Sequence, residues 1–475
     1  MTASASSAAS WPAGLLLAYY GDDFTGSTDA LEAITAAGVP SVLFLRLPTD
    51  EMLARFPGVR CVGLAGSSRG RAPAWMDAEL PAVFARLKSL GAPILHYKVC
   101  STFDSAPHVG SIGRAVDLGV GAMGGRWSPM VVGVPRLGRF QVFGTLFVTV
   151  NGTTYRLDRH PTMSRHPVTP MDEADLGRHL ARQTARRIDL IDMAQIRADA
   201  ADTRRAMLEG DDTPVVLIDV MDEDTLTEAG RLIWENRGEG LFSASSSGLQ
   251  YALAAHWRRL GLLPAQPGLP AAAGVPQIAV VSGSCSPVTA AQIGWARAHG
   301  FHTERLDLSR ALDPTLREAE IARTLEVARA ALGRGESPVI YSAEGPDDPH
   351  VLAFDHTAST LGLTRAEAAR TVGTVLAEIM RRMVEARLVR RIMVAGGDSS
   401  GEVMEALNAF ALDIAAGLAP GAPLCRAWSD DPLYDGLEVV LKGGQMGPTN
   451  FFTTVRDGLP AAAAPVRATG RSAVA

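Results

Sequence analysis

Two adjacent aspartates stand where a short apolar run gives way to polar residues. The stretch LAYYGDDFTGSTDALEAITAAG, residues 17–38, passes through Asp22 and Asp23 into a helical pattern that ends at Gly38. In open α/β sheets, ligands bind beyond the carboxyl ends of the strands, which is where this pair is predicted to lie. Carboxylates there can accept hydrogen bonds from substrate hydroxyls, hold Mg²⁺, or take a proton from an attacking hydroxyl.

Helix capping explains only one of these two carboxylates. Asp23 is nearer to the helix and is the expected N-cap, since an Asp side chain accepts hydrogen bonds from the first free N–H groups of a helix. Asp22 then has no structural role, and two like charges side by side repel each other. We therefore predict a catalytic role for the pair, with Asp22 as the first candidate for the base.

Three further segments carry polar side chains after apolar runs and are predicted to face the same edge. Residues 66–71, GSSRGR, contain an arginine that could pair with a carboxylate through two hydrogen bonds. Residues 96–105 and 135–144 add basic, hydroxyl and acidic groups. The predicted substrate-binding residues are Asp22, Asp23, Arg69, Lys98, Ser101, Thr102, Asp104 and Arg139. His160 and His166 are interrupted by prolines, and no set of residues is predicted to hold a resident metal.

Three loops of small residues follow apolar runs in the second half of the chain. Small residues let backbone N–H groups approach an anion closely, and a helix N-terminus adds about half a positive charge. Each loop suits a phosphate, although none has the Walker A or G-x-G-x-x-G spacing. The predicted nucleotide-binding residues are Ser282, Ser284, Gly396, Gly397, Asp398, Ser399, Lys442, Gly443 and Gly444.

Strand and helix patterns alternate along both halves, which predicts an α/β fold of two α/β domains with mainly parallel sheets and an active-site cleft between them. The apolar runs predicted as strands are residues 15–20, 41–45, 59–66, 93–99, 129–135, 213–220, 277–286, 337–345 and 392–395. Helices are predicted at 222–234, at 364–387 with a Thr364–Glu367 capping box, and after Gly397 with Val403, Leu407 and Phe410 on the buried face.

The length of 475 residues is typical of two domains. A Pro-, Gly- and Ala-rich stretch without charge divides the chain. We predict an N-terminal sugar-acid-binding domain at 13–262, a linker at 263–276 and a C-terminal nucleotide-binding domain at 277–458. Disordered tails are predicted at 1–12 and 459–475.

Composition excludes several classes of protein. The 45 basic and 51 acidic residues give a net charge of −6, which argues against a nucleic-acid-binding or polybasic membrane-binding protein. No apolar run is long enough to span a bilayer, and the N-terminal residues lack the pattern of a signal peptide. Four scattered cysteines, without a C-x-x-C pair, are typical of reduced thiols in a cytoplasmic protein.

The motifs together resemble the four-carbon acid sugar kinase family. GDDFTGSTDA is similar to the family's A-D-D-L-T-G-A-x-D signature, and AGGDSSGEVMEAL to its G-G-[DE]-T-S-G loop. APGAPL resembles its P-G-V-P segment and LKGGQMG its K-S-G-x-F-G. SGSCSPVTAAQI is similar to the start of its second domain. The motifs occur in family order from Tyr20 to Phe452.

This resemblance implies ATP-dependent phosphorylation of a hydroxyl on a small acid sugar, such as a tetronate or 3-oxo-tetronate. The sugar acid would bind the N-terminal domain and ATP with Mg²⁺ the C-terminal domain. The base would be Asp22 or Asp23, and Asp398 remains an alternative. Asp398 could also help to hold Mg²⁺, and Lys442 could neutralise developing charge on the phosphates.

One motif departs from the family pattern K-x-x-D-S-T-x-R-G. YKVCSTFDSAP has Cys100 where the aspartate would be and Asp104 near the place of the arginine. An acidic group in place of a basic one beside an anionic substrate changes what can bind. We therefore expect a variant substrate, for instance a branched acid sugar such as 3-oxo-isoapionate.

Two other functions remain open from the residues alone. An NAD(P)-dependent dehydrogenase could use the same glycine loops, although no G-x-G-x-x-G follows a strand. A non-catalytic two-lobed sensor could bind a sugar acid without turnover. An exposed sheet edge could also pair two copies into a homodimer.

Overall fold

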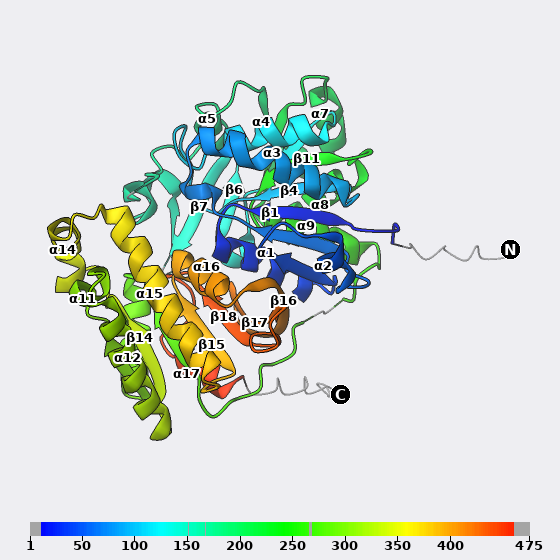
Figure 1. Ribbon diagram of the computed structural model, residues 1–475. Coiled ribbons are helices and arrows are strands. Elements are labelled where there is room, and N and C mark those ends of the chain that lie inside the picture. The colour runs from blue at the N-terminus through cyan, green and yellow to red at the C-terminus, as the bar shows by residue number, and fades with distance from the viewer. Residues whose placement is uncertain (1–10, 151, 167, 266–267, 460–475) are drawn as a thin grey trace, which may run out of the picture.

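Five parallel strands, β11-β4-β1-β3-β2 in spatial order, form the main sheet of the N-terminal domain (Figure 1). The structure is a computed structural model that describes residues 11–150, 152–166, 168–265 and 268–459. The strands are β1 (Leu17–Gly21), β2 (Ser41–Phe44), β3 (Cys61–Ala65), β4 (Ile94–Lys98) and β11 (Leu241–Ser245). The surrounding helices are α1 (Phe24–Ala36), α2 (Asp50–Ala54), α3 (Pro73–Ser89), α4 (Ile112–Met123), α8 (Glu223–Glu235) and α9 (Gly248–Arg259). Helices on both faces explain why the strands read as continuous apolar runs.

Two of the predicted strands belong to a separate small sheet. Strand β10 (Val215–Ile218) pairs with β5 (Ser128–Met130) and β9 (Ile188–Ile191), and none of the three joins the main sheet. Strand β5 runs beside β11, but serine hydroxyls bridge the two: Ser128 Oγ donates to Phe242 O and Ser243 Oγ to Pro129 O, both at 2.8 Å. Pro129 has no N–H to donate, so a backbone ladder cannot form there.

A second small sheet is antiparallel and carries one predicted site residue. It consists of β6 (Arg139–Val142), β7 (Thr145–Val150) and β8 (Thr153–Arg156). The remaining helices of this domain are α5 (Leu176–Leu180), α6 (Met193–Arg197) and α7 (Ala201–Leu208), with 3₁₀ turns at Ser68–Gly70, Pro135–Leu137, Leu157–Arg159 and Met163–Arg165.

The C-terminal domain repeats the parallel design in the order β18-β15-β12-β14-β13. Its strands are β12 (Ala279–Ser282), β13 (Phe301–Arg305), β14 (Ser337–Tyr341), β15 (Arg391–Ala395) and β18 (Glu438–Lys442). Its helices are α10 (Pro287–Arg297), α11 (Leu308–Leu312), α12 (Arg317–Gly333), α13 (Pro349–Leu352), α14 (Phe354–Thr360), α15 (Arg365–Glu385), α16 (Gly397–Ala406) and α17 (Phe451–Asp457). The chain passes from β14 across β12 to β15, so the strand order reverses between β12 and β15. Ligands bind at such a switch point.

Of the two helices predicted at 364–387 and after Gly397, the first begins as predicted and the second ends earlier than predicted. Helix α15 has the predicted capping box between Thr364 and Glu367. The prediction that Phe410 lies on the buried face of a helix is wrong, because α16 ends at Ala406 and Phe410 lies in the next strand. Asn408 adopts a left-handed φ of 46°, which Asn tolerates better than most residues and which ends the helical path.

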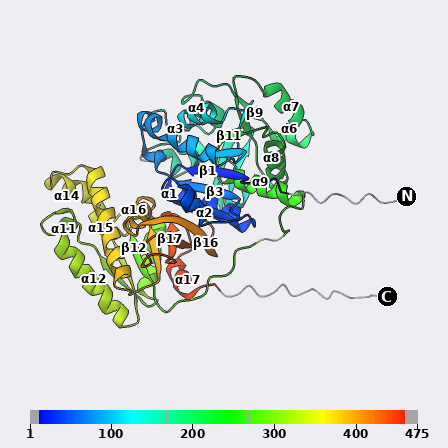
Figure 2. The same ribbon diagram turned by 45° about the vertical axis from the view of Figure 1, so that its right-hand side comes forward.

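A hairpin joins the two domain sheets into one twelve-stranded sheet (Figures 1 and 2). It consists of β16 (Ala409–Ala419) and β17 (Ala422–Ser429). Strand β16 pairs antiparallel with β2 of the N-terminal domain, with Ala411 opposite Phe44, and β17 pairs with β18. The domains therefore share a sheet, where the sequence indicated two separate ones.

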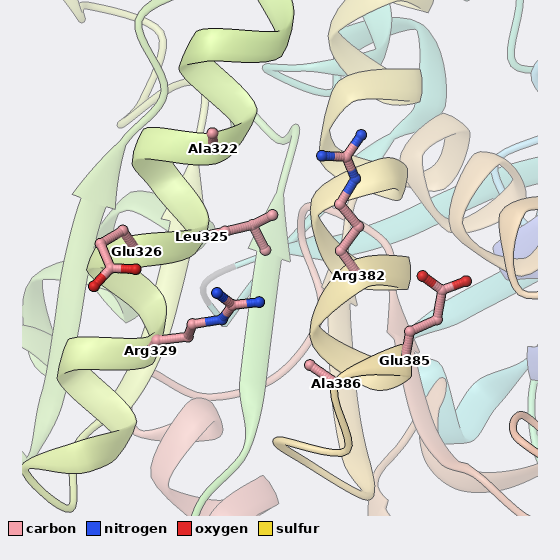
Figure 3. A pocket seen from close by; sticks show the side chains of 7 residues that line it. All are labelled: Ala322, Leu325, Glu326, Arg329, Arg382, Glu385 and Ala386. Carbon is pink, nitrogen blue, oxygen red and sulfur yellow. The ribbon is translucent and has the colours of Figure 1, made fainter.

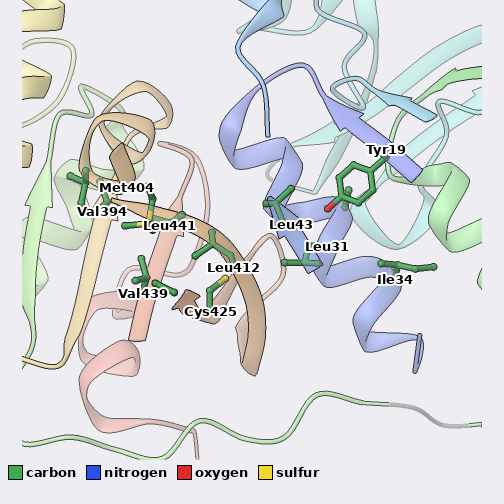
Figure 4. Close-up of a cluster of buried hydrophobic side chains, with 14 of the residues drawn as sticks. Tyr19, Leu31, Ile34, Leu43, Val394, Met404, Leu412, Cys425, Val439 and Leu441 are labelled. Carbon is green, nitrogen blue, oxygen red and sulfur yellow. The ribbon is translucent and has the colours of Figure 1, made fainter. Parts of the chain in front are cut away.

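The hydrophobic core also continues across the domain junction. Leu31 and Ile34 on α1 belong to the same buried cluster as Leu412 of β16 and Val439 of β18 (Figure 4). Helix α1 packs against β16, β17 and β18 as well as against its own domain. The start of α1 is thereby held against the C-terminal domain.

The predicted linker runs along the C-terminal domain where the structure describes it. Gly417 N donates to Pro270 O at 3.0 Å, and Val275 N to Arg456 O at 2.7 Å. The predicted tails lie mostly outside the described residues. Trp11, which the prediction placed in the N-terminal tail, packs edge-on against Trp257 with ring centroids 5.2 Å apart. No helix among the described residues is long and apolar enough to cross a membrane.

One hydrogen bond connects α1 with the tip of the β16–β17 hairpin. Gly421 N donates to Glu32 Oε2 at 2.6 Å. Burial raises the pKa of Glu32 to about 7, and Asp29 nearby adds to the shift. A carboxyl whose folded-state pKa is raised stabilises the fold in its protonated form, and that contribution is lost as the pH rises from 4.5 through 7.

Glu32→Gln is expected to stabilise the protein at pH 8 and to have little effect at pH 5. Gln keeps a neutral acceptor for Gly421, so it avoids the penalty of about 1.4 kcal/mol per pH unit that ionisation imposes between the two pKa values. Thermal unfolding at both pH values measures the difference, with Glu51→Gln at an exposed position as the control. Equal effects of Glu32→Gln at pH 5 and pH 8 would contradict the assignment.

Candidate active site

Arg69 binds both of the adjacent aspartates. Its Nε donates to Asp22 Oδ2 at 3.1 Å and its Nη2 to Asp22 Oδ1 at 2.7 Å, and Nη2 also donates to Asp23 Oδ1 at 2.8 Å. The guanidinium thus offsets the repulsion that made the pair unusual in sequence. The predicted pairing of Arg69 with a carboxylate through two hydrogen bonds occurs with Asp22 of the protein itself, and the prediction that Arg69 also binds the substrate stays a prediction.

The two aspartates differ in exposure and in pKa. Asp23 is the N-cap of α1, as predicted, and its side chain is 25% exposed, whereas that of Asp22 is 3% exposed. Burial raises the pKa of Asp22 to about 6, although Arg69 opposes the shift. For Asp23 burial acts in the same direction, but Arg69, Lys98 and the bonds from Thr25 and Gly26 outweigh it and lower the pKa. Asp23 is therefore the ionised carboxylate that a ligand can reach.

Lys98 and Arg139 bring positive charge to the same place. Lys98, at the end of β4, is buried, and its Nζ lies 3.6 Å from Asp29 Oδ2. Arg139 donates through Nη1 to Thr149 O at 3.4 Å and to Leu137 O. Burial lowers the pKa of Arg139, while Cys100, Asp29 and Asp104 nearby oppose the shift. Among the described residues no carboxylate forms an ion pair with Arg139.

The loop after β4 is held in a strained conformation. Phe103 is buried with a left-handed φ of 59°, which a bulky residue adopts only where its surroundings force it. Thr102 Oγ1 donates to Asp104 Oδ1 at 2.5 Å and lies 2.9 Å from Cys100 Sγ. Asp104 is thus turned toward Thr102, while Ser101 and Cys100 are partly exposed. Burial, and Asp104 beside it, raise the pKa of Cys100 to about 11.

The three glycine-containing loops of the C-terminal domain meet at the switch point of its sheet. Gly283 N donates to Ala395 O at 3.1 Å, and Gly396 N to Lys442 O at 3.0 Å. A Cβ on Gly444 would lie 2.8 Å from Ser284 Oγ, so this close approach requires glycine. All the predicted nucleotide-binding residues therefore lie at one edge of the sheet, at the ends of strands β12 and β18, in the loops after β12, β15 and β18, or in the first turn of α16.

Helix α16 begins without a capping side chain. Its N-cap is Gly396, whose φ of 128° favours glycine, and no side chain of the described residues bonds to its first amides. By contrast, Asp23 caps α1 and Ser286 caps α10. The first N–H groups of a helix need a partner, and an anion such as phosphate supplies one.

Buried Lys442 forms hydrogen bonds that hold two of these loops together. The side chain is fully buried, and its Nζ donates to Thr289 Oγ1 at 2.9 Å and to Gly444 O at 3.3 Å. Thr289 in turn donates to Ser284 Oγ at 3.1 Å. Burial lowers the pKa of Lys442 to about 8. In this arrangement the ammonium group ties the loop after β18 to the loop after β12.

The two sets of residues meet at the start of α1. Thr25 Oγ1 donates to Asp23 Oδ2 at 3.1 Å. The same Oγ1 lies 3.9 Å from the place that a Cβ on Gly397 or on Gly443 would occupy. Thr25 therefore lies between Asp23, to which it donates a hydrogen bond, and the loops of the other domain. Helices α1 and α16 lie side by side in both views (Figures 1 and 2).

Sequence reasoning missed Thr25 and Asp29. Both lie on α1, and with Glu32 they share one helix face at spacings of four and seven residues. Their helical spacing, which places one hydroxyl and two carboxylates on the same face of the helix, was the available signal. Their neighbours on other elements, Lys98 and Gly397, could not be read from the sequence.

Other candidate ligands lie elsewhere. His160 Nδ1 accepts hydrogen bonds from Thr162 N and Met163 N at 3.1 Å, which is a turn-capping role. Within the described ranges no three His, Cys, Asp or Glu side chains are arranged to hold a metal. A groove of about 570 Å³ between α12 and α15 (Figure 3) is lined in part by Arg382, Glu385 and Ala386, which precede β15, so it lies toward the opposite edge of the sheet from the glycine loops.

Comparison with known proteins identifies the family. A model described as "Sugar-binding N-terminal domain" matches residues 17–253, and one described as "Nucleotide-binding C-terminal domain" matches 279–452. A 3-oxo-isoapionate kinase of Paraburkholderia graminis is 68% identical over 95% of this chain and 96% of its own. A 3-oxo-tetronate kinase of Cupriavidus necator is 31% identical over 92% of this chain and 95% of its own. The chain belongs to the four-carbon acid sugar kinase family.

Membership in the acid sugar kinase family confirms the resemblance, the α/β fold and the prediction of an ATP-dependent acid-sugar kinase. It favours the kinase over the dehydrogenase and the sensor. A solved Salmonella typhimurium protein, described as a putative tRNA synthase, has a TM-score of 0.72 at 25% identity, covering 93% of this chain and 98% of its own. A Haemophilus influenzae protein of the same fold has a TM-score of 0.69 at 23% identity, covering 92% and 99%.

ATP is expected to protect the thiol of Cys285 in this kinase from alkylation. Cys285 lies in the loop after β12 and is exposed, whereas Cys61 and Cys425 are buried and Cys100 is partly exposed. Exposure governs access of the reagent, so a bound nucleotide should slow labelling at Cys285 several-fold. Mass spectrometry of peptides labelled with and without ATP measures this, with Cys285→Ser as the control. Labelling that saturating ATP leaves unchanged would place the nucleotide elsewhere.

Proposed function

We propose that this kinase transfers the γ-phosphoryl group of ATP to a hydroxyl of 3-oxo-isoapionate or a closely similar branched 3-oxo acid sugar. The 68% identical relative named for that substrate supports the choice. The observation that carries the mechanism is the uncapped N-terminus of α16, which lies against Thr25 and therefore beside Asp23. This geometry brings an anion site and a carboxylate of the other domain together.

The C-terminal loops would hold the phosphates. The free amides at the start of α16 would face an anion, with the loop around Gly443 beside them. In the loop around Ser284, the N–H groups of Gly283, Ser284 and Ser286 donate within the protein, so this loop would contribute mainly its serine hydroxyls. The space fits the group, because a Cβ on Gly397 or Gly443 would project into it without meeting an atom closer than 3.9 Å or 3.5 Å, respectively. Mg²⁺ would neutralise charge on the phosphates and is expected to be bound mainly by their oxygens, with Asp398 in the first turn of α16 as the protein carboxylate.

Asp23 would accept the proton of the attacking hydroxyl. Phosphoryl transfer depends on positioning and charge stabilisation, so a carboxylate that is ionised and reachable suits this role. Asp22 was the first candidate from the sequence. Both oxygens of each aspartate accept hydrogen bonds, but the side chain of Asp22 is 3% exposed and that of Asp23 is 25% exposed. We therefore assign the proton to Asp23 and give Asp22 the role of holding Arg69 in place.

The carboxylate of the acid sugar would bind near Arg139. Arg69 is occupied by two aspartates, and Lys98 faces Asp29. Arg139 is the positively charged member of this group without an ion-pair partner among the described residues. Ser101 and the neutral thiol of Cys100 would offer hydrogen bonds to sugar hydroxyls.

Two expectations about the surroundings remain part of the proposal. A homodimer could form along β13, which pairs on one side only in the described sheet and is partly exposed. The free cysteines and the use of ATP are in keeping with a cytoplasmic location.

Gly397→Ala is expected to raise the KM for ATP at least tenfold while the protein stays folded. The added methyl group would meet no atom closer than 3.9 Å in the protein, but it would enter the space assigned to phosphate. Steady-state kinetics with ATP as the varied substrate measure the effect. Gly294→Ala, in α10 with nothing within 4 Å, is the control. An unchanged KM would remove this loop from the nucleotide site.

Asp23→Asn is expected to lower kcat by about 10²–10⁴-fold, the usual contribution of a general base. Asn caps a helix about as well as Asp, so the fold should be kept while the proton acceptor is lost. The matched control is Asp222→Asn, which changes the N-cap of α8. Turnover and ATP binding by calorimetry are measured on both variants. Wild-type kcat in Asp23→Asn would show that this aspartate only caps the helix.

A further inference from the structure

A second hollow lies at the carboxyl edge of the C-terminal sheet. It has a volume of about 540 Å³ and lies between the first turns of α10, the end of β13 and the loop that follows β14. Pro287 and Ala290 of α10 form one wall, and residues 344–349 of the loop form the other. This size is in the range of small-ligand sites in proteins.

The hollow begins where the phosphate loops end. Its wall residue Pro287 directly follows Ser286, and a Cβ on Gly444 of the neighbouring loop would lie 2.9 Å from Ser286 Cβ. Ser342 N donates to Ser282 O at 3.0 Å, so the loop after β14 is fixed beside the loop after β12. A molecule with phosphates on the glycine loops could therefore extend along α10 into this space.

The lining offers apolar surface and one free carboxylate. Pro287, Ala290 and Pro346 supply flat apolar contact. Glu344 forms an ion pair with Arg297, and Asp348 with Arg305, so both are occupied.

Asp347 is the exception in this lining. It is exposed and has no ion-pair or hydrogen-bond partner among the described residues. Carboxylates that accept hydrogen bonds from ribose hydroxyls are a recurring feature of nucleotide sites.

We propose that this hollow binds the nucleoside end of the nucleotide, with the base against Pro287 and Ala290 and the ribose hydroxyls bonded to Asp347. The inference rests on the proposed kinase function and adds the place and the chemistry of nucleoside recognition. The acid sugar is a poor alternative occupant, because its carboxylate would face three carboxylates, Glu344, Asp347 and Asp348, and one arginine, Arg305, which already pairs with two of them. A neutral, hydroxyl-bearing group fits this lining.

Filling the hollow tests the proposal. Ala290→Phe is expected to raise the KM for ATP at least tenfold and to leave the KM for the acid sugar unchanged. Ala291→Phe is the matched control, since Ala291 is exposed on the same helix and does not line the hollow. Inorganic tripolyphosphate, which lacks a nucleoside, should compete with ATP at the same inhibition constant in the wild type and in Ala290→Phe.

The results distinguish failure of the proposed nucleoside site from failure of the proposed kinase function. An unchanged KM for ATP in Ala290→Phe would overturn the nucleoside site while the proposed function stands. Failure of both ATP and tripolyphosphate to bind the wild type would overturn the proposed function itself. If Ala290→Phe does not fold or loses both ligands, Asp347→Asn decides. The wild type should prefer ATP over its 2′,3′-dideoxy analogue at least tenfold, and that preference should fall to a few-fold in the variant. An undiminished preference would overturn the proposal.

Discussion

The short antiparallel pairing of β2 with β16 decides where the two halves of the site meet. It joins the domain sheets edge to edge and places α1 across β16, β17 and β18. The N-terminus of α1, with Asp23 and Thr25, then lies against the start of α16. Because this pairing is part of one continuous sheet and one continuous core, the approach of acid sugar and nucleotide is built into the fold. A hinge at the linker is not needed to explain how the two sets of residues come together.

The charged groups have different kinds of partner on the two sides of the domain junction. On the sugar side, one arginine offsets two buried or half-buried carboxylates, and Arg139 has no ion-pair partner in the described parts of the chain, which is why we propose it for the anionic substrate. On the nucleotide side, Lys442 is buried with hydroxyl and carbonyl partners alone, and α16 begins with uncapped amides. Both features leave positive potential near the glycine loops, where phosphates would add the missing negative charge. The acidic residues 344–348 lie outside this region, at the proposed nucleoside hollow.

Much of the fold followed from pattern alone. Apolar runs bounded by glycine predicted the parallel strands, and the Thr364–Glu367 box predicted the start of α15. The runs at 129–135 and 213–220 were predicted as strands, but the sequence did not indicate that they belong to a small sheet of their own, because pairing partners are set by packing and not by local sequence. Phe410 was assigned to a helix for a similar reason. An apolar residue at helical spacing satisfies a helix pattern even when a left-handed Asn408 has already ended the helix.

The sequence by itself determined which polar residues and glycines lie at the carboxyl ends of the parallel strands, because strand–loop–helix patterns place loop residues at one edge of a parallel sheet. It placed Asp22, Asp23 and the glycine loops there in this way, and it identified Asp23 as the helix cap. Only the tertiary structure decided their partners. Arg69, 46 residues from Asp23, turned out to bind the protein's own carboxylates, and Thr25 to face Gly397 of the other domain. Such contacts join residues far apart in the chain, and their geometry depends on how the sheets twist and pack, which no local pattern encodes.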